Sequence, residues 1–537
     1  MWEHILRQEE QFSASRYVTK MTAMKKIYTL LFSALVCSCS LIEDDSLFLS
    51  PEDCCKTIEQ CNAAVASAYT QLNTVYSYQF EIAVEGCTDL YHCLSSTQDA
   101  QMDVSPANAR FGNTMWEYGY AGVRNANYAI WGMEHSGLDT LALKPLMAEA
   151  KIMRAFWYYL LTSFFSDVPF YRNYVRTIPE IEAVRRLPRM SATATRDSLI
   201  RELQECIGDL PQQRRCDVQM SEADKVLQRA GAAMGYMLIA KMAMWNGSKT
   251  EGETATGWWN TAIDALNNLE AMYDPDGTGL EAYPLSDIPY SVKNSPESIF
   301  EVPHTYSVSG LKVYSNLAAI MMPYDKEKNE QTGEVTYGGV KVPQLGTDCT
   351  VWQPLRPNAF MHKGLFKKED TKDLRKDMTL VWSWEGQDFS RSWSGPKFWC
   401  YDMYANYDYN NYTIFRYADA VLMLAECYNE IGEYTTAIKY LNQVKSRAGI
   451  DAYEKFVSKS RLLEEIQNER GRELAGEFQR KFDLVRWGNW YQRVMEYNDY
   501  DNLKNNLRAC HEYYPIPDTE VALSDGKLDN KAYEQGL

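Results

Sequence analysis

Apolar residues recur every three or four positions along much of this chain, and this spacing constrains its fold more than any other feature. Such spacing is typical of amphipathic helices, which bury one face and expose the other. It predicts helices in segments 54–72, 116–134, 146–165, 195–210, 224–245, 258–271, 417–431, 435–447 and 462–475. The segments come in pairs. Because a helix pair buries its apolar face only against neighbouring pairs, the repetition predicts one continuous helical scaffold.

The clearest pair lies at 417–447 and has the spacing of a tetratricopeptide repeat. The residues that make up this pattern are Leu424, Tyr428, Gly432, Tyr434, Ala437, Leu441 and Val444. Ala437 is small enough for two helices to cross closely, and Gly432 permits the tight turn between them. Weaker versions of the pair are formed by 224–245 with 258–271 and by 146–165 with 195–210. The predicted fold is therefore mainly α, a tetratricopeptide-like scaffold of three or four helix pairs.

The pattern changes in the segment 274–411, which is rich in Gly, Pro, Asn, Tyr and Trp and holds short alternating runs such as 298–302. This composition predicts long loops with small strands, inserted into the scaffold. The expected organisation is helix pairs around 54–271 and 417–475, with a loop-rich insertion around 274–411. Loops of that length in a compact fold usually carry function.

The amino terminus predicts export. From Met24, two lysines precede an apolar run at 27–36, and small residues follow it, which is the order of a signal peptide. The run is about half of the ~20 residues that a helix needs to span a bilayer. Residues 1–23 carry acidic residues that do not belong in a signal start, so translation is expected to begin at Met21 or Met24.

A lipid anchor is predicted just after the apolar run. Cys39 follows the small residue Ser38, as in a lipobox, and is the expected lipid-carrying cysteine. Cys37 is the alternative, although a bulky residue precedes it. Several acyl chains on one residue hold an otherwise soluble body firmly on a membrane. Residues 1–39 are therefore assigned to the signal peptide and lipobox, and 40–537 to a single mature domain.

The balance of charged residues argues against a nucleic-acid partner. Among 537 residues, 72 acids outnumber 55 bases and give a formal net charge of -17, whereas phosphate contacts need Lys and Arg. The histidines and cysteines form no Cys-x-x-Cys or His-Glu-x-x-His motif, so neither a metal nor another cofactor is expected. Aromatic residues reach 13% of the chain, more than a helical core needs, and some are expected to face a ligand.

Several short blocks of distinctive sequence follow the predicted lipobox. They are 149–155 with 167–169, 416–419 with 424–426, 441–444 with 447–449, 469–474 with 482–488, and 514–517. Each block is weak alone, but all of them in this order resemble the SusD/RagB family of outer-membrane nutrient-binding lipoproteins across almost the whole mature chain. The chain departs from the family pattern at 47–51, which affects only the first residues of the mature protein.

The resemblance implies a helical body with four tetratricopeptide-like pairs that caps a SusC-type TonB-dependent transporter. It also implies a lipid-anchored, surface-exposed protein in the outer membrane of a Gram-negative, Bacteroidetes-like cell. The acid cluster at 43–45 resembles the surface-export tag of such lipoproteins and equally fits a solvated tether. The cargo stays open: aromatic loops favour a glycan or oligosaccharide, and a peptide, as for a RagB-like scaffold, is the alternative.

Aromatic residues in loops are the best candidates for ligand contacts, because sugar rings stack apolar C–H faces on Trp and Tyr while their hydroxyls bond to polar side chains. A first loop holds Asp89, Tyr91, His92, Gln98 and Asp103. The insertion holds Tyr306, Tyr324, Trp352, Trp382, Trp384, Trp393 and Trp399. The alternative for each aromatic residue is ordinary packing in the core.

Carboxylates beside basic residues invite a catalytic interpretation. The pairs concerned are Glu149 with Arg154, Asp419 with Arg416, and Asp483 with Arg486. Each lies in an amphipathic helical stretch, where a buried pair fixes the packing, and the sequence places no histidine beside it. Neither a nucleophile motif nor a phosphate loop is present. The sequence therefore predicts a binding protein and not an enzyme.

Overall fold

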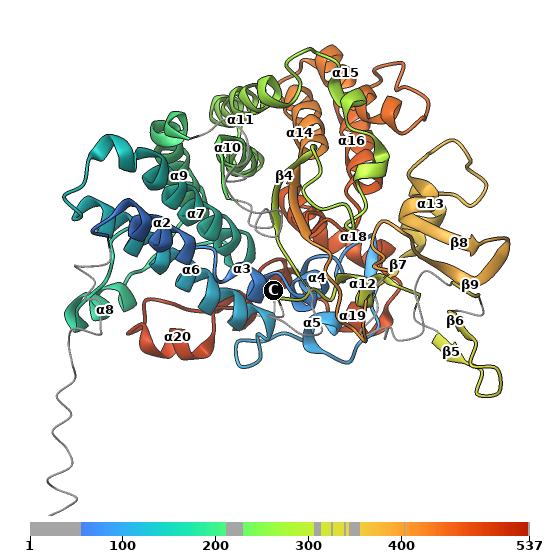
Figure 1. Cartoon of the computed structure of the whole chain (residues 1–537), viewed down its shortest axis with the longest axis horizontal. Helices are drawn as coiled ribbons and strands as arrows, with labels where there is room; N and C mark the ends of the chain where they lie inside the picture. Colours follow the sequence, from blue (N-terminus) through green and yellow to red (C-terminus); the bar gives the residue numbers. More distant parts are fainter. Residues whose placement is uncertain are drawn as a thin grey trace, which may run out of the picture. The chain divides into compact units, whose positions relative to one another are not determined.

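The computed structural model describes residues 55–210, 229–305, 313–323, 326–337, 340–342, 355–401 and 403–534. Residues 55–537 form one compact unit. Cys39 and the predicted signal segment lie outside the described residues. Figure 1 shows a body built mostly of helices, with short strand pairs between and beside them. The predicted mainly α fold is confirmed.

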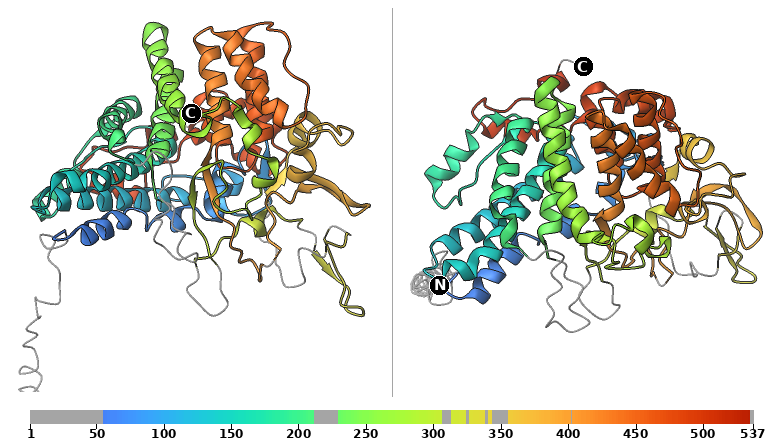
Figure 2. Two further views of the ribbon diagram at one scale, coloured as in Figure 1. Left: turned by 45° about the horizontal axis from the view of Figure 1, so that its top comes forward. Right: turned by 90° about the horizontal axis from the view of Figure 1, so that it is seen from above.

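The long helices form the scaffold. They are α2 (Ile58–Ser67), α6 (Phe111–Glu134), α7 (Thr140–Phe165), α9 (Ala192–Cys206), α10 (Ala232–Ser248), α11 (Gly252–Tyr273), α14 (Tyr417–Glu430), α15 (Tyr434–Arg447) and α16 (Lys459–Glu473). Figure 2 shows them side by side, from α6 and α7 through α10 and α11 to α14, α15 and α16. Their order along the chain is thus also their order in space, as expected of stacked repeats.

The predicted pair at 417–447 is confirmed as α14 and α15, which pack on each other. Gly432 has a φ of 89° at the turn between them, a conformation that residues with a Cβ rarely adopt. Ala437 is completely buried where the helices meet. The pair predicted at 224–245 and 258–271 corresponds to α10 (Ala232–Ser248) and α11 (Gly252–Tyr273), which pack on each other, although α10 begins later than predicted.

The partner of α7 differs in part from the prediction. α7 contacts α9, as expected, but it packs more extensively on α6. Gly122 of α6 makes this possible, because a Cβ there would lie 2.3 Å from the Trp157 ring of α7. Residues 152–165 of α7 are buried without interruption, so this helix runs through the centre of the scaffold. The single helix predicted at 54–72 is instead divided into α2 and the short α3 (Leu72–Val75).

Shorter helices surround the scaffold. They are α4 (Tyr78–Val84), α5 (Gln98–Gln101), α8 (Ile178–Arg185), α12 (Leu317–Met321), α13 (Lys376–Thr379), α17 (Arg480–Arg486), α18 (Trp490–Tyr497), α19 (Asp501–Asn506), α20 (Asp518–Leu523) and α21 (Lys531–Glu534). The strands form antiparallel pairs: β1 (Tyr91–Cys93) with β7 (Leu355–Pro357), β2 (Val168–Pro169) with β3 (Arg189–Met190), β4 (Ser298–Val302) with β10 (Tyr412–Arg416), β5 (Lys326–Lys328) with β6 (Val335–Tyr337), and β8 (Leu380–Trp384) with β9 (Gln387–Ser394).

The strand predicted at 298–302 is confirmed as β4, but it does not belong to a surface loop. All of its residues are buried, and it pairs with β10, which leads directly into α14. The β4 and β10 ribbon is therefore part of the helical core. The remainder of the described insertion carries short strands and loops together with the short helices α12 (Leu317–Met321) and α13 (Lys376–Thr379), which the sequence did not predict.

Candidate ligand-binding site

The first predicted loop is fastened to the carboxy-terminal part of the chain. The carboxylate of Asp89 is fully buried and accepts hydrogen bonds from Arg480 at 2.7 Å and Arg493 at 2.6 Å. Burial alone would raise the pKa of Asp89, but the two guanidinium groups outweigh it and lower that pKa. This geometry gives Asp89 a structural role and leaves its oxygens engaged.

The neighbours of Asp89 are also largely enclosed. Tyr91 is completely buried in β1. His92 is 8% exposed, and its Nδ1 lies 2.7 Å from Oδ1 of Asn358. Gln98 is half-buried at the start of α5, and Asp103 is exposed beyond that helix. The first loop therefore places Asp89, Tyr91 and His92 in the interior, and Gln98 and Asp103 are the predicted residues there with an appreciable exposed surface.

The predicted aromatic residues of the insertion divide into two groups by burial. Tyr306, Tyr324 and Trp352 lie outside the described residues. Trp393 and Trp399 are completely buried, so they pack the interior of the insertion. Trp382 and Trp384, both on β8, are half-buried and present part of each ring to solvent.

The two half-buried tryptophans line a groove of about 310 Å³, which we call the hairpin groove. It is defined by Lys368, Lys376, Asp377, Val381, Trp382, Ser383, Trp384 and Glu385. The Nζ of Lys376 lies 5.7 Å from the centre of the Trp382 ring. Buried Trp399 supports Trp384 from below, with ring centres 4.9 Å apart. The groove thus combines supported aromatic faces with donors and acceptors, which suits a ligand rich in hydroxyl groups.

The local sequence explains why these rings are presented together. Trp384 pairs with Gln387, so Glu385 and Gly386 form a two-residue turn with φ values of 48° and 81°. Two positive φ values are the mark of a type I′ turn, which favours a tight hairpin and has glycine as its usual second residue. The turn fixes the register of β8 against β9 and thereby the positions of Trp382 and Trp384.

Sequence reasoning missed the charged residues of the groove. Lys376 and Asp377 come from α13, and Lys368 comes from the loop before it. Lys376 and Asp377 directly precede β8 along the chain, so their position was a usable signal, whereas nothing in the local pattern places Lys368 beside β8. The Glu385 and Gly386 pair after a tryptophan-rich run was a usable hairpin signal.

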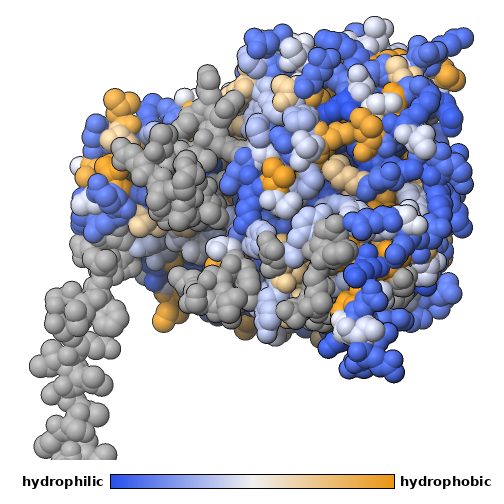
Figure 3. All heavy atoms as spheres, turned by 45° about the vertical axis from the view of Figure 1, so that its right-hand side comes forward, coloured by the Kyte–Doolittle hydropathy of each residue, from blue (hydrophilic) through white to orange (hydrophobic). Residues whose placement is uncertain are grey.

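The face of the molecule on the side of the insertion is mainly polar. In the coloured part of Figure 3, hydrophilic residues dominate and hydrophobic residues lie in small separate patches. Large apolar patches mark protein or membrane contacts, whereas scattered ones are normal. The coloured part of this face therefore has the scattered apolar residues of an ordinary protein surface.

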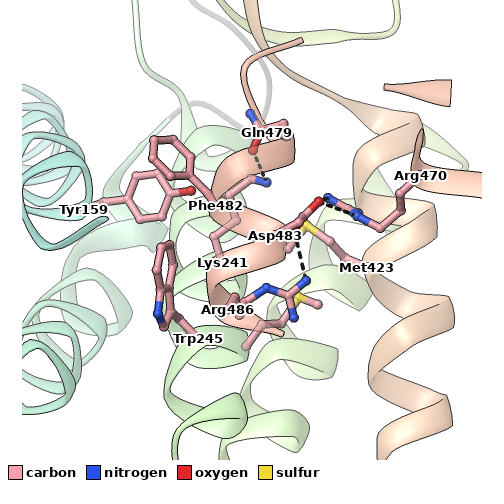
Figure 4. A pocket seen from close by; sticks show the side chains of 10 residues that line it. Tyr159, Lys241, Trp245, Met423, Arg470, Gln479, Phe482, Asp483 and Arg486 are labelled. Carbon is pink, nitrogen blue, oxygen red and sulfur yellow. Dashed lines mark hydrogen bonds and ion pairs between the residues drawn. The ribbon is translucent and has the colours of Figure 1, made fainter. Parts of the chain in front are cut away.

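A separate cavity adjoins the buried charges of α10, α16 and α17 and is shown in Figure 4. Its volume is about 20 Å³, which is room for about one water molecule. Asp483 accepts hydrogen bonds there from Arg470 at 2.7 Å and Arg486 at 3.0 Å. Burial would raise the pKa of Asp483, but the two arginines lower it to about 2. The predicted pair of Asp483 with Arg486 therefore fastens helices together and faces no substrate-sized space.

The other two pairs considered in the sequence have different partners from those expected. Glu149 and Arg154 are five residues apart on α7, and residues so spaced do not face each other on a helix. Asp419 lies on α14, whereas Arg416 ends the preceding strand. The observed partners are Arg229 for Glu149 at 2.6 Å, and Lys241 at 2.7 Å and Arg470 at 2.9 Å for Asp419. All of these side chains are buried or nearly so, which fits the structural role expected of them.

The described part of the chain offers neither a metal site nor a membrane-spanning helix. In it, no group of three or more His, Cys, Asp or Glu side chains is arranged to hold a metal ion. None of the described helices combines the length and apolar character needed to cross a membrane.

Comparison with known proteins agrees with the sequence blocks. Residues 401–533 match the model of the SusD family, and residues 46–226 match a model described as starch-binding and associating with the outer membrane. The chain belongs to the SusD/RagB family. A relative from Formosa agariphila, SusD-like protein P25, is 24% identical over 94% of this chain and 98% of its own length.

Solved structures share the SusD-like fold. Surface glycan-binding protein A from Bacteroides uniformis superposes with a TM-score of 0.67 and 21% identity, covering 89% of this chain and all of that one. Surface glycan-binding protein A from Bacteroides thetaiotaomicron, in complex with laminarihexaose, superposes with a TM-score of 0.63 and 19% identity, covering 88% and 99% of the two chains. At these identities the likeness establishes the fold, and the predicted family and fold are confirmed.

Proposed function

We propose that this SusD-like protein binds a glycan at the cell surface and delivers it, without catalysis, to a SusC-like TonB-dependent transporter in the outer membrane. The hairpin groove is the observation that carries the proposal, because Trp382 and Trp384 offer supported aromatic faces beside lysine and carboxylate groups. The laminarihexaose complex of a protein with the same fold supports a saccharide as the ligand class. The family description supports association with the outer membrane.

Binding is tested by a glycan array followed by calorimetric titration, with the protein lacking residues 1–39. Laminarihexaose and maltohexaose are the first titrants, since the former is bound by a protein of this fold and the latter is a starch fragment. Trp384→Ala should weaken binding of the glycan that the wild type prefers. Tyr404→Ala is the matched control, because Tyr404 is an aromatic residue of the insertion that is 55% exposed and lies outside the groove. Equal loss in both variants would contradict the proposal.

The absence of catalysis is tested in the same samples. Chromatography of the bound glycan after prolonged incubation should return it unchanged. A shortened product, formed by wild type and lost in an Asp377→Asn variant, would make the hairpin groove an active site. If the protein binds peptides and none of the glycans of the array, the result would instead favour the peptide-binding alternative.

Anchoring and delivery are tested in cells. Cys39→Ala should release the protein from the outer-membrane fraction, because the lipid attached to that cysteine is the proposed anchor. Co-purification from detergent extracts should recover a large TonB-dependent barrel protein with the wild type. Recovery of Cys39→Ala in the membrane fraction would contradict the lipid anchor.

A further inference from the structure

A second groove lies over α6. Figure 1 shows α8 and α20, which also line it, at the end of the body opposite β8, the strand that carries Trp382 and Trp384. Its volume is about 470 Å³, larger than the hairpin groove and within the usual range of small-molecule sites. α6 forms its floor, and α8 and α20 contribute the opposite wall. We call it the scaffold groove and define it by Glu117, Tyr118, Tyr120, Arg124, Tyr171 and Glu520.

The floor of the scaffold groove carries a hydrogen-bond donor, Arg124, and a hydrogen-bond acceptor, Glu117, seven residues apart on α6. Glu117, Ala121 and Arg124 are spaced so that they share one face of α6. Seven residues of helix rise about 10 Å, so the two charged groups stand at the ends of a short trough with a methyl group between them. Glu117 and Arg124 are both exposed, and neither forms an ion pair with another described residue. Their hydrogen-bonding capacity is open to a ligand.

Aromatic rings form the side of this trough. Tyr120 and Tyr171 stack almost in parallel, with ring centres 6.1 Å apart and planes 5° apart. The hydroxyl of Tyr120 donates a hydrogen bond to the carbonyl of Pro169 at 2.8 Å, which fixes the ring. Tyr118 is half-buried on the same stretch of α6. Fixed rings beside polar groups give a C–H surface a place to stack at little entropic cost.

The charges of the scaffold groove balance. Glu117 and Glu520 are matched by Arg124 and Arg185 along its walls. A site for a phosphate or a carboxylate would need an excess of cations. The hairpin groove has the same balance, with Lys368 and Lys376 against Asp377 and Glu385. Both grooves therefore offer aromatic faces and equal numbers of acidic and basic side chains to an uncharged, hydroxyl-rich ligand.

We infer that the scaffold groove is a second binding site, for a neutral oligosaccharide, and that one protein holds a glycan at both ends of its body. The inference rests on the proposed glycan function. Two linked sites bind a long polymer more tightly than either site alone, although each is open and modest by itself. A protein that gathers polysaccharide would therefore hold the polymer more tightly without any contact beyond those of the two sites.

Titration with the preferred hexasaccharide, and with its parent polysaccharide, tests the inference on purified protein. The hairpin variant is Trp382→Ala with Trp384→Ala, and the scaffold variant is Tyr118→Ala with Arg124→Ala. A second scaffold variant, Glu117→Gln with Arg124→Met, changes only exposed side chains and guards against misfolding of the first. Arg201→Ala is the control, because it removes an exposed arginine of α9 outside both grooves.

Wild type and control should bind two hexasaccharides per chain, each groove variant one, and the combined variant none. Affinity for the polysaccharide should fall about tenfold or more in either groove variant.

Complete loss of hexasaccharide binding in the hairpin variant, with scaffold variants like wild type, would overturn the second site and leave the proposed function standing. Failure of wild type to bind any glycan of the array would overturn both. Scaffold variants that bind glycan normally but lose the transporter in co-purification would make the groove a protein-docking surface and overturn the inference.

Discussion

Charged side chains meet in two contrasting regions of this protein, around Arg416 in the core and beside Trp384 in the insertion. In the core, Arg416 contacts Glu473 and Glu477 at 2.7 Å and Glu297 at 2.8 Å. All four side chains are almost completely buried. In the hairpin groove, Lys368, Asp377 and Glu385 are exposed beside half-buried indole rings, and only Lys376 is buried among the charged residues that line it.

The difference shows what each region can do. Burial would raise the pKa of Glu473, but the surrounding arginines Arg447, Arg416 and Arg375 hold it well below its usual value. Charges that are desolvated and fully paired fix the packing of β10 against α16 and have no capacity left for a ligand. Charges at the rim of an open groove keep that capacity. The residues of the family blocks thus build the scaffold, and the less distinctive insertion presents the proposed binding surface.

The largest effect should follow from breaking the core network. Arg416→Met removes the cation that three buried carboxylates share, and we expect it to lower the free energy of unfolding by about 3–5 kcal/mol. Chemical denaturation followed by circular dichroism measures the change. Arg416→Lys keeps the charge but cannot reach all three carboxylates, so it should fall between wild type and Arg416→Met. A stability equal to wild type in Arg416→Met would remove the contrast between the two regions.

Two tryptophans of one hairpin sharpen the comparison. Trp393 is completely buried and pairs across the hairpin with buried Val381, so Trp393→Ala should cost about 3–5 kcal/mol of stability. Trp384→Ala should leave the unfolding midpoint nearly unchanged and weaken glycan binding by about 2 kcal/mol, or about thirtyfold in Kd. Calorimetric titration and thermal denaturation of both variants measure the two effects. The reverse pattern would place the ligand away from the hairpin groove.

The sequence was sufficient for the parts of the fold that depend on local spacing. Gly432 and Ala437 mark the turn and the close crossing of α14 and α15, and both are determined within one helix pair. The packing of α7 on α6 was not predictable in the same way, because it depends on Gly122 meeting Trp157 across two helices. Helix periodicity reveals which face is apolar but not which neighbour covers it.

The candidate site was predictable only in part, for a related reason. Asp89 and Arg480 are separated by 391 residues and still form one ion pair, so no local pattern reveals that Asp89 is engaged. Trp384 and Trp393 look alike in sequence, and their burial differs because of the register between β8 and β9. Which aromatic residues face solvent therefore follows from strand pairing, which composition does not contain.

A buried acid gives the core a pH dependence that the hairpin groove should lack. Burial raises the pKa of Glu85, which follows α4, to about 8. The folded protein keeps this proton while the unfolded chain loses it above its ordinary pKa, so stability falls as the pH rises between about 5 and 8. The slope is about 1.4 kcal/mol per pH unit for one proton. Glu85→Gln should remove this contribution to the pH dependence of stability. Denaturation of the wild type and of Glu85→Gln from pH 5 to pH 8 measures the difference. Parallel curves of unfolding free energy against pH would show that Glu85 is ionised throughout.

The smallest effect should come from an ion pair that resembles the core network in composition alone. Arg461 and Glu464 lie 2.5 Å apart on α16, with 66% and 53% of their side chains exposed. Water screens this pair and competes for it, so Arg461→Ala should change the free energy of unfolding by less than about 1 kcal/mol. Denaturation in low and high salt measures the change beside Arg416→Met. A loss for Arg461→Ala as large as that for Arg416→Met would mean that charge pairing as such, and not its burial, determines what these residues contribute.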